Sequence, residues 1–345
     1  MNYNISPDLY QHLRTAKLLA TNRLLRPNFV ANVAGIGIGK KVTGDTATET
    51  WCIRIYVQSK LDIEDVAPAF LLPSSFLDVP TDVIPVGLFG RTGLTPRGVT
   101  PPATGPGSPI RIQSSAPNVN SGAIGTLGGI VVDTSNGHNN YILSCNHILT
   151  VNGRVKTDPQ ANIVPADASA GGHAIATPGV FKELERNEDN QVDCALARTA
   201  AGNGKQTLGK PAAPTLGTKV IKTGAVTGKT RGTIVDVDAD FYVDYSFGTF
   251  RFTNQVVIDG QGSNGQGDVF ATDGDSGSIV FTDTDEMQAI GMVFAEAGRF
   301  AVACPLTEVF NQLEQEAKLA AGSLSLVVKS TTQPKETGVA SRSSS

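Results

Sequence analysis

The chain has 345 residues, a formal net charge of −4, 40% hydrophobic residues and 17% charged residues. This length is typical of about two domains, with enough apolar material for a core in each. The slightly negative net charge indicates no basic surface for nucleic acid and no polybasic patch for a membrane, so neither partner is expected. The 37 glycines and 19 prolines favour many short strands joined by turns.

The N-terminal 25 residues contain apolar positions interrupted by charged and amide residues, so no secretory signal is expected. No run of 18 apolar residues indicates a membrane-spanning segment. Four widely spaced cysteines are more typical of reduced, buried thiols than of a disulfide framework. These features predict a cytoplasmic protein.

Residues 1–90 are expected to form a small α/β domain. A helix begins at Pro7, and its apolar positions recur at helical spacing: Leu9, Leu13, Ala16 and Ala20. Residues 30–40 and 50–57 predict two strands joined by a turn at Gly44, and 79–87 predicts another strand. This accessory domain or pro-domain is also the expected surface for any oligomerisation.

A proline- and glycine-rich segment follows, with five of each in residues 90–109. This composition excludes a helix or central strand and predicts an exposed linker at 91–109. Such linkers are cut readily by proteases, and Arg91 and Arg97 mark candidate processing points.

Residues 110–322 contain many short β-rich runs with almost no helix between them, which favours a barrel or sandwich. Residues 306–320 are the exception, because their apolar positions fall on one helical face. The last dozen residues are polar and serine-rich, and residues 323–345 are predicted to form a mostly disordered tail.

The segment ATDGDSGSIV, residues 271–280, places Ser276 in a glycine-rich loop. A serine hydroxyl becomes a useful nucleophile only with a base, a group that orients the base, and donors for the oxyanion. The chain has four histidines. His12 lies on the predicted N-terminal helix, His138 in a turn, and His173 in a glycine-rich loop, whereas His147 follows an apolar run, YILSC. A core histidine bonded to a backbone carbonyl is the other interpretation of His147.

Asp193 has apolar neighbours on both sides in QVDCALAR. A buried carboxylate is costly unless it is paired or accepts several hydrogen bonds, so this position favours an imidazole partner. A strand-edge acid facing solvent is the alternative. The order His147, Asp193, Ser276 matches one of the three known chain orders of the serine triad. The nucleophile elbow G-x-S-x-G is absent because Ser278 occupies the last position, and strand–helix alternation is also missing.

The motifs SCNHIL, VDCAL and TDGDSGS resemble the histidine, aspartate and serine motifs of the trypsin/chymotrypsin-like serine proteases. The resemblance covers roughly residues 115–320. It implies a mainly β fold, a double β-barrel with a C-terminal helix, here preceded by the α/β domain. It also implies a protein or peptide substrate and an acyl-enzyme mechanism, with neither a cofactor nor a metal.

The resemblance assigns the roles residue by residue. Ser276 is the nucleophile, His147 the general base and then acid, and Asp193 the group that orients His147. The N–H groups of Gly274 and Ser276 form the oxyanion hole. The substrate pocket is expected between two segments: Phe270, Ala271 and Thr272 on one wall, and Phe294, Ala295 and Glu296 on the other. With no aspartate at its base, this pocket favours a small or apolar residue, although Glu296 is a candidate for attracting a basic one.

Two features depart from the family pattern. Asp275 precedes the serine, as in relatives whose aspartate pairs with a new N-terminus after cleavage. Here either a cut linker supplies that amine or Asp275 is satisfied internally. Cys145 and Cys194 flank the site and are expected to be small buried hydrophobic residues rather than a redox switch.

Three functions therefore stay open. The first is an active serine endopeptidase, possessing all three triad residues. The second is a catalytically silent protein that keeps the fold as a binding scaffold. The third is an esterase or a protease that processes its own linker.

Overall fold

The computed structural model describes residues 5–25, 32–44, 46–90, 105–113, 124–135, 139–150, 161–166, 173–200, 207–260 and 269–328. Arg91, Arg97, His138 and most of the expected linker lie outside these ranges. The expected fold class is confirmed, because the described chain is mainly β with an N-terminal α/β module and a helix near its C-terminal end. None of the described helices combines the length and hydropathy needed to cross a membrane.

The N-terminal module consists of one helix and four strands, with two single turns of 3-10 helix at Ile63–Asp65 and Pro68–Phe70. The helix begins where expected, at Pro7, and the Ser6 hydroxyl caps it by accepting a hydrogen bond from the Leu9 N–H at 3.3 Å. Gly44 adopts φ +55°, as its predicted turn requires. The elements are α1 (Pro7–Leu24), β1 (Val33–Thr43), β2 (Thr46–Val57), β3 (Ser75–Phe76) and β4 (Val79–Pro85).

Six strands close into a barrel in the C-terminal half. Their order is β16-β19-β18-β17-β14-β15, and β15 pairs back with β16 to complete the ring. The strands are β14 (Lys219–Gly224), β15 (Gly228–Tyr245), β16 (Gly248–Asp259), β17 (Ile279–Thr282), β18 (Ala289–Ala297) and β19 (Phe300–Pro305).

The part of the chain between the module and the barrel, together with β20 after the barrel, forms two sheets, ordered β10-β12-β8-β7-β20-β13 and β6-β5-β9. A bridge between Ile163 and Ala176 connects the two sheets. The strands are β5 (Pro109–Gln113), β6 (Ile124–Thr126), β7 (Gly129–Asp133), β8 (Asn139–Ser144), β9 (Asn162–Pro165), β10 (Thr177–Phe181), β12 (Ala195–Thr199), β13 (Thr207–Gly209) and β20 (Leu324–Val328). The short β11 (Asp189–Asn190) pairs with β16, and two helices, α2 (Asn146–Leu149) and α3 (Leu306–Glu316), complete the fold.

The C-terminal end corrects one expectation. Leu324–Val328 lie within the tail predicted for residues 323–345 but form β20, which pairs with β7 and β13. The segment LSLVV is mostly apolar and ends in two β-branched valines, and Leu324 and Leu326 are buried in the core. Burial of these side chains stabilises the strand within the sheet. The preceding helix ends at Glu316 rather than 320, close to Lys318 with φ +55°.

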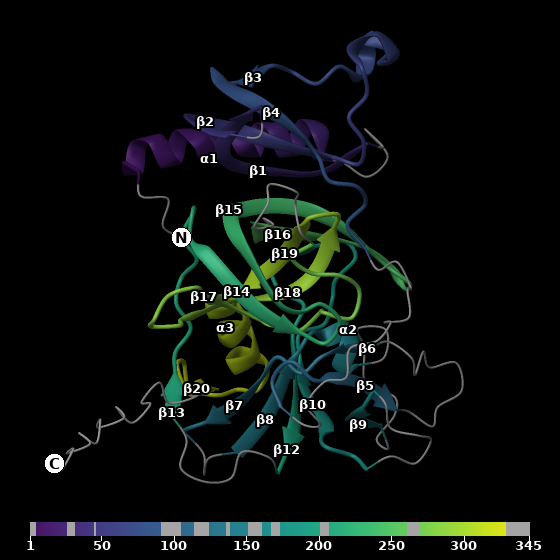
Figure 1. Cartoon of the computed structure of the whole chain (residues 1–345), viewed down its shortest axis with the longest axis vertical. Coiled ribbons are helices and arrows are strands. Elements are labelled where there is room, and N and C mark those ends of the chain that lie inside the picture. The colour runs from purple at the N-terminus through teal and green to yellow at the C-terminus, as the bar shows by residue number, and fades with distance from the viewer. Residues whose placement is uncertain are drawn as a thin grey trace, which may run out of the picture.

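Strand β15 joins the module to the barrel. Within one sheet, β15 pairs with β14 and β16 of the barrel and also with β1, which aligns Gly35 with Phe241. A Cβ at Gly35 would lie 2.2 Å from the Phe241 ring, so this close pairing requires glycine. Figure 1 shows the module at the top, β15 directly beneath it, and β7, β8 and β12 at the bottom.

A buried cluster of charges strengthens this junction. The Lys17 amine on α1 lies 2.7 Å from carboxylate oxygens of both Asp238 and Asp240 on β15. Burial alone would lower the pKa of Lys17, but the two carboxylates outweigh burial and raise it. Asp236, two residues earlier on the same strand, accepts hydrogen bonds from the Tyr56 hydroxyl at 3.1 Å and from the Asp238 N–H at 3.0 Å.

Replacing Lys17 by Ala is expected to lower the free energy of unfolding by about 3 kcal/mol, because it leaves two buried carboxylates without their shared cation. Urea denaturation measures this change. The control is Arg231→Ala. Arg231 lies on β15, the strand that carries Asp238 and Asp240, and its ion pair with Asp283 is at the surface, because the Arg231 side chain is 61% exposed. Its loss should cost less than about 1 kcal/mol. Equal losses in the two variants would contradict the importance of the Lys17 cluster.

A second expectation concerns pH. Burial raises the pKa of Asp236 from an ordinary value of 3.8 to about 7. Because the folded pKa lies above the unfolded one, the folded state holds the proton more tightly, and stability from this group falls as pH rises from about 4 through 7. In Asp236→Asn this decrease is absent. When the free energy of unfolding is measured in urea from pH 5 to 8, the stability of the variant relative to the wild type should therefore increase with pH. A constant difference between the two proteins would contradict the buried, protonated carboxyl.

Candidate active site

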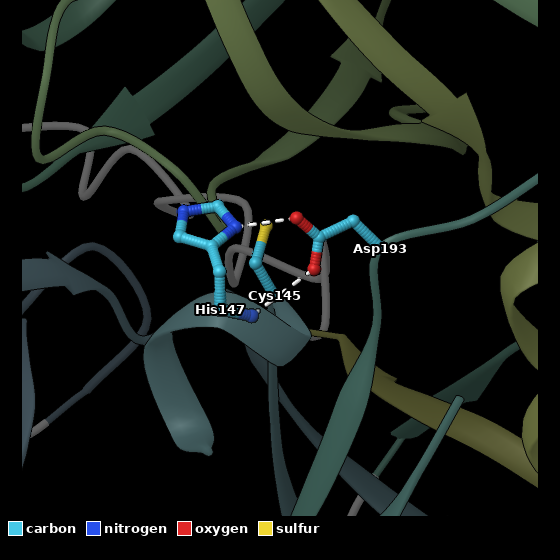
Figure 2. A group of neighbouring side chains, drawn as sticks. All are labelled: Cys145, His147 and Asp193. Carbon is cyan, nitrogen blue, oxygen red and sulfur yellow. Dashed lines mark hydrogen bonds and ion pairs between the residues drawn. The ribbon is translucent and has the colours of Figure 1, made fainter. Parts of the chain in front are cut away.

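The structure brings His147 and Asp193 together. His147 follows the apolar strand β8, as its sequence indicated, but it lies in the one-turn helix α2 and not in the strand itself. Asp193 lies between β11 and β12. The His147 Nδ1 contacts the Asp193 Oδ2, and the His147 backbone N–H donates to Oδ1 at 3.2 Å. Figure 2 shows both contacts as dashed lines.

The Asp193 carboxylate is completely buried and satisfied by donors on both oxygens. Besides His147, the Tyr245 hydroxyl donates to Oδ2 at 2.7 Å. Burial alone would raise the pKa of Asp193, but the adjacent imidazole and the hydrogen bonds from His147 and Tyr245 lower it below its ordinary value. The carboxylate is therefore held ionised in the interior, and a solvent-facing acid at this position is excluded.

The opposite imidazole nitrogen makes no hydrogen bond to any described residue. Because Nδ1 faces a carboxylate, it carries the ring proton and leaves Nε2 as the basic atom. Within the described residues Nε2 is buried and has no hydrogen-bond partner. This arrangement gives His147 the tautomer and the free lone pair that a general base requires.

The serine loop, residues 272–278, is fixed by two hydrogen bonds from Thr126. The Thr126 N–H donates to the Ser276 carbonyl at 2.8 Å, and the Thr126 hydroxyl donates to the Gly274 carbonyl at 2.9 Å. Gly274 and Gly277 adopt φ +96° and +97°, a conformation that glycine adopts without strain. The loop therefore has a defined shape.

The serine loop lies against the segment that carries His147. The Val293 carbonyl accepts hydrogen bonds both from the Gly277 N–H at 2.8 Å and from the Cys145 thiol at 3.3 Å. A Cβ at Gly277 would also lie 2.1 Å from the Ser144 Oγ. The residue after Ser276 and the residues just before His147 thus meet in the interior.

Ser276 itself is buried, at 3% exposure, and its hydroxyl is directed at the Phe294 carbonyl at 3.4 Å. The hydrogen bonds of the described residues include none between the Ser276 Oγ and the His147 Nε2.

Two backbone donors of the serine loop are free. In the part of the chain that the structure describes, the N–H groups of Gly274 and Ser276 donate to no acceptor, whereas those of Asp275, Gly277 and Ser278 all do. Free, fixed N–H groups beside a nucleophile are what an oxyanion hole requires.

Asp275 is satisfied internally. Its Oδ2 lies 3.2 Å from the Lys222 amine on β14, and both side chains are completely buried. The same carboxylate accepts hydrogen bonds from the N–H groups of Val226 at 2.8 Å and Thr227 at 3.1 Å, and from the Thr227 hydroxyl at 2.6 Å. A buried lysine and several neutral donors of the same chain therefore satisfy this carboxylate.

Three thiols surround the carboxylate. Cys145 lies beside the His147–Asp193 pair. Its Sγ, a ring nitrogen of His147 and a carboxylate oxygen of Asp193 all lie within 4.8 Å of one another (Figure 2). The Cys304 Sγ accepts a hydrogen bond from the Asp193 N–H at 3.3 Å. Burial raises the pKa of Cys145, Cys194 and Cys304 well above the ordinary value. The neutral thiol is neither a good metal ligand nor a nucleophile, so these residues serve as small packing groups.

Most of the expected pocket residues lie in the interior. Phe270, Ala271, Phe294 and Ala295 are each at most 2% exposed, and the Phe294 ring packs on Phe252 with centroids 4.6 Å apart. Thr272 and Glu296 are half-buried. Of the remaining histidines in the described ranges, His12 and His173 are exposed and lie on other elements.

Two residues at the site were not identified from the sequence. Tyr245 lies 52 residues after Asp193 in a strand that precedes a tight turn, and Lys222 lies in KVIKTG, where it is typical of a surface lysine. For Lys222 the available signal was its position directly after two apolar strand residues, Val220 and Ile221.

No protein-family model matches the chain, and no curated protein matches it in sequence. Several solved structures resemble it. A glutamic-acid-specific serine protease is 19% identical, with 65% of this chain and 100% of that chain covered and a TM-score of 0.40. Nocardiopsis protease is 16% identical, covering 65% and 98%, with a TM-score of 0.41. Cellulomonas bogoriensis chymotrypsin is 18% identical, covering 65% and 98%, with a TM-score of 0.38. At this level of similarity, the chemistry of the site depends on the geometry described above.

Replacing Lys222 by Met is expected to lower the free energy of unfolding by about 3 kcal/mol, because Asp275 keeps its neutral donors but loses its buried cation. Lys219→Met is the matched control, since Lys219 is exposed on the same strand. It should change stability by no more than about 0.5 kcal/mol. Equal urea midpoints and slopes for Lys222→Met and wild type would contradict a structural ion pair.

Proposed function

We propose that the chain is a serine endopeptidase that hydrolyses peptide bonds in protein or peptide substrates. The observation that carries this proposal is the buried His147–Asp193 pair, in which Nε2 has no hydrogen-bond partner among the described residues, next to a serine loop with two N–H groups that donate to no described acceptor. These are the base, the orienting acid and the oxyanion donors that a serine nucleophile needs.

In the proposed reaction the Ser276 Oγ attacks the carbonyl carbon of the scissile bond, and its proton passes to the His147 Nε2. The Gly274 and Ser276 N–H groups stabilise the oxyanion. His147 then gives the proton to the leaving amine, and the acyl group remains on Ser276 until water, activated by the same base, releases it. Asp193 stabilises the imidazolium through both steps.

The internal pairing of Asp275 with Lys222 supports activity without a cut in the linker. The loop conformation that relatives reach with a new N-terminus is held here by a side chain of the same barrel. Self-cleavage of the linker would then be a consequence of activity and not a condition for it.

The substrate preference rests on the apolar side chains at the expected pocket. Four of its six residues are apolar and interior, and Thr272 and Glu296 are half-buried. We propose that the pocket accepts a small or apolar side chain.

One observation favours a catalytically silent scaffold as the second candidate. Ser276 and His147 are each 3% exposed, so a substrate reaches them only after local opening.

The experiment that separates the two functions is intact-mass analysis after treatment with a fluorophosphonate. The wild type is expected to gain one adduct and Ser276→Ala none. Ser278→Ala is the matched control, because this serine lies two residues away in the same loop, and it should label like the wild type. Folded wild type that gains no adduct, before and after nicking of the linker with trypsin, would favour the scaffold.

A further inference from the structure

Tyr245 contacts the site from the far end of β15. It is the last residue of this strand, where it pairs with Gly248 at the turn into β16. Its hydroxyl donates to the Asp193 Oδ2 at 2.7 Å, the same oxygen that His147 Nδ1 contacts. Its ring lies against the His147 ring, with centroids 5.2 Å apart and planes inclined by 58°.

We propose that Tyr245 is a positioning residue that fixes the Asp193 carboxylate and, through it, the orientation of the His147 imidazole. The inference rests on the proposed function, since it concerns the same triad. Tyr245 does not reach the reacting atoms, so its contribution passes entirely through Asp193.

The position of the Tyr245 ring is itself fixed. It stacks on Phe247 with centroids 5.1 Å apart and meets Phe250 edge-on at 5.7 Å. Phe252 lies on a further side at 6.3 Å. A side chain with only two rotatable bonds, packed among three aromatic rings, presents its hydroxyl in one place.

The carboxylate needs this donor. Asp193 is wholly buried, and without Tyr245 its Oδ2 would have His147 as its only donor among the described residues. A carboxylate held by a single side-chain partner is free to rotate with that partner, whereas three donors from two directions define its plane. The Tyr245 hydroxyl thus keeps Oδ2 aligned with Nδ1 while the imidazole gains and loses its second proton.

The hydroxyl also withdraws negative charge from Oδ2. When it is removed, the full charge of the carboxylate acts on the imidazolium, which stabilises the protonated pair. The other titratable groups facing Asp193 are the thiols of Cys145, Cys194 and Cys304, and burial raises the pKa of each well above the ordinary value. They stay neutral, so the acid limb of the pH profile reports the His147–Asp193 pair.

The test is Tyr245→Phe, which keeps the ring and removes the hydroxyl. We expect kcat to fall about 10-fold, in line with the loss of a hydrogen bond to a charged group, while KM changes less than 2-fold or so. The acid limb of kcat/KM should move to higher pH. Rates are normalised by fluorophosphonate titration, so that unfolded protein does not contribute.

Tyr56→Phe is the matched control. Its hydroxyl also binds a buried acidic side chain, the carboxyl group of Asp236, but on the module side of β15. We expect this variant to lose stability in urea while kcat per titrated site and the pH profile stay unchanged. Tyr245→Phe with a wild-type kcat and pH profile would overturn the proposal, and so would equal effects of the two variants on catalysis.

A further readout separates this inference from the proposed function. The low-field proton signal of the His147–Asp193 hydrogen bond can be followed by NMR without substrate. If the folded wild type fails to label with fluorophosphonate both before and after nicking of the linker, the proposed function has failed, but the signal must still shift or broaden in Tyr245→Phe and not in Tyr56→Phe. An unchanged signal in Tyr245→Phe would refute the positioning role on its own.

Discussion

Strand β15 is the constraint on which the rest of the structure depends. Its first residue, Gly228, follows the Thr227 that binds Asp275, and its last, Tyr245, binds Asp193. Between them the strand pairs with β14 and β16, which closes the barrel, and with β1, which attaches the module. An 18-residue strand of this kind has one register, because a shift by one residue turns every side chain to the opposite face. The junction, the serine loop and the histidine pair are therefore set by the same register.

The interior holds its acids ionised or protonated according to the donors each one meets. Asp193 has an imidazole, a backbone N–H and a tyrosine hydroxyl, and its pKa is lowered. Asp275 has a lysine and several neutral donors. Asp236 has a tyrosine and one backbone N–H, and burial raises its pKa to about 7. Carboxylates that need donors from several elements fix those elements relative to one another, which apolar packing does less specifically.

Local sequence patterns predicted most helices and strands, but they could not predict contacts between residues far apart in the chain. The helix at Pro7, the turn at Gly44 and the burial of Asp193 follow from spacing and neighbours within a few residues. The pairing of β1 with β15 joins residues about two hundred positions apart, and no local pattern carries that register. Tyr245 and Lys222 read as ordinary strand residues because their partners come from other parts of the chain. Strand β20 was missed because its short apolar run precedes a polar, serine-rich end.

Because β1 pairs with β15, cleavage of the linker does not by itself separate the module from the barrel. The module and the barrel share backbone hydrogen bonds, a glycine-dependent contact at Gly35 and the Lys17 charge cluster. A peptide bond cut between residues 90 and 105 removes none of these. The two fragments would behave as complementing halves of one sheet, associated in native solution and separated only by denaturant. Freeing the barrel from its module thus requires exposing an edge of β15 together with its buried acids.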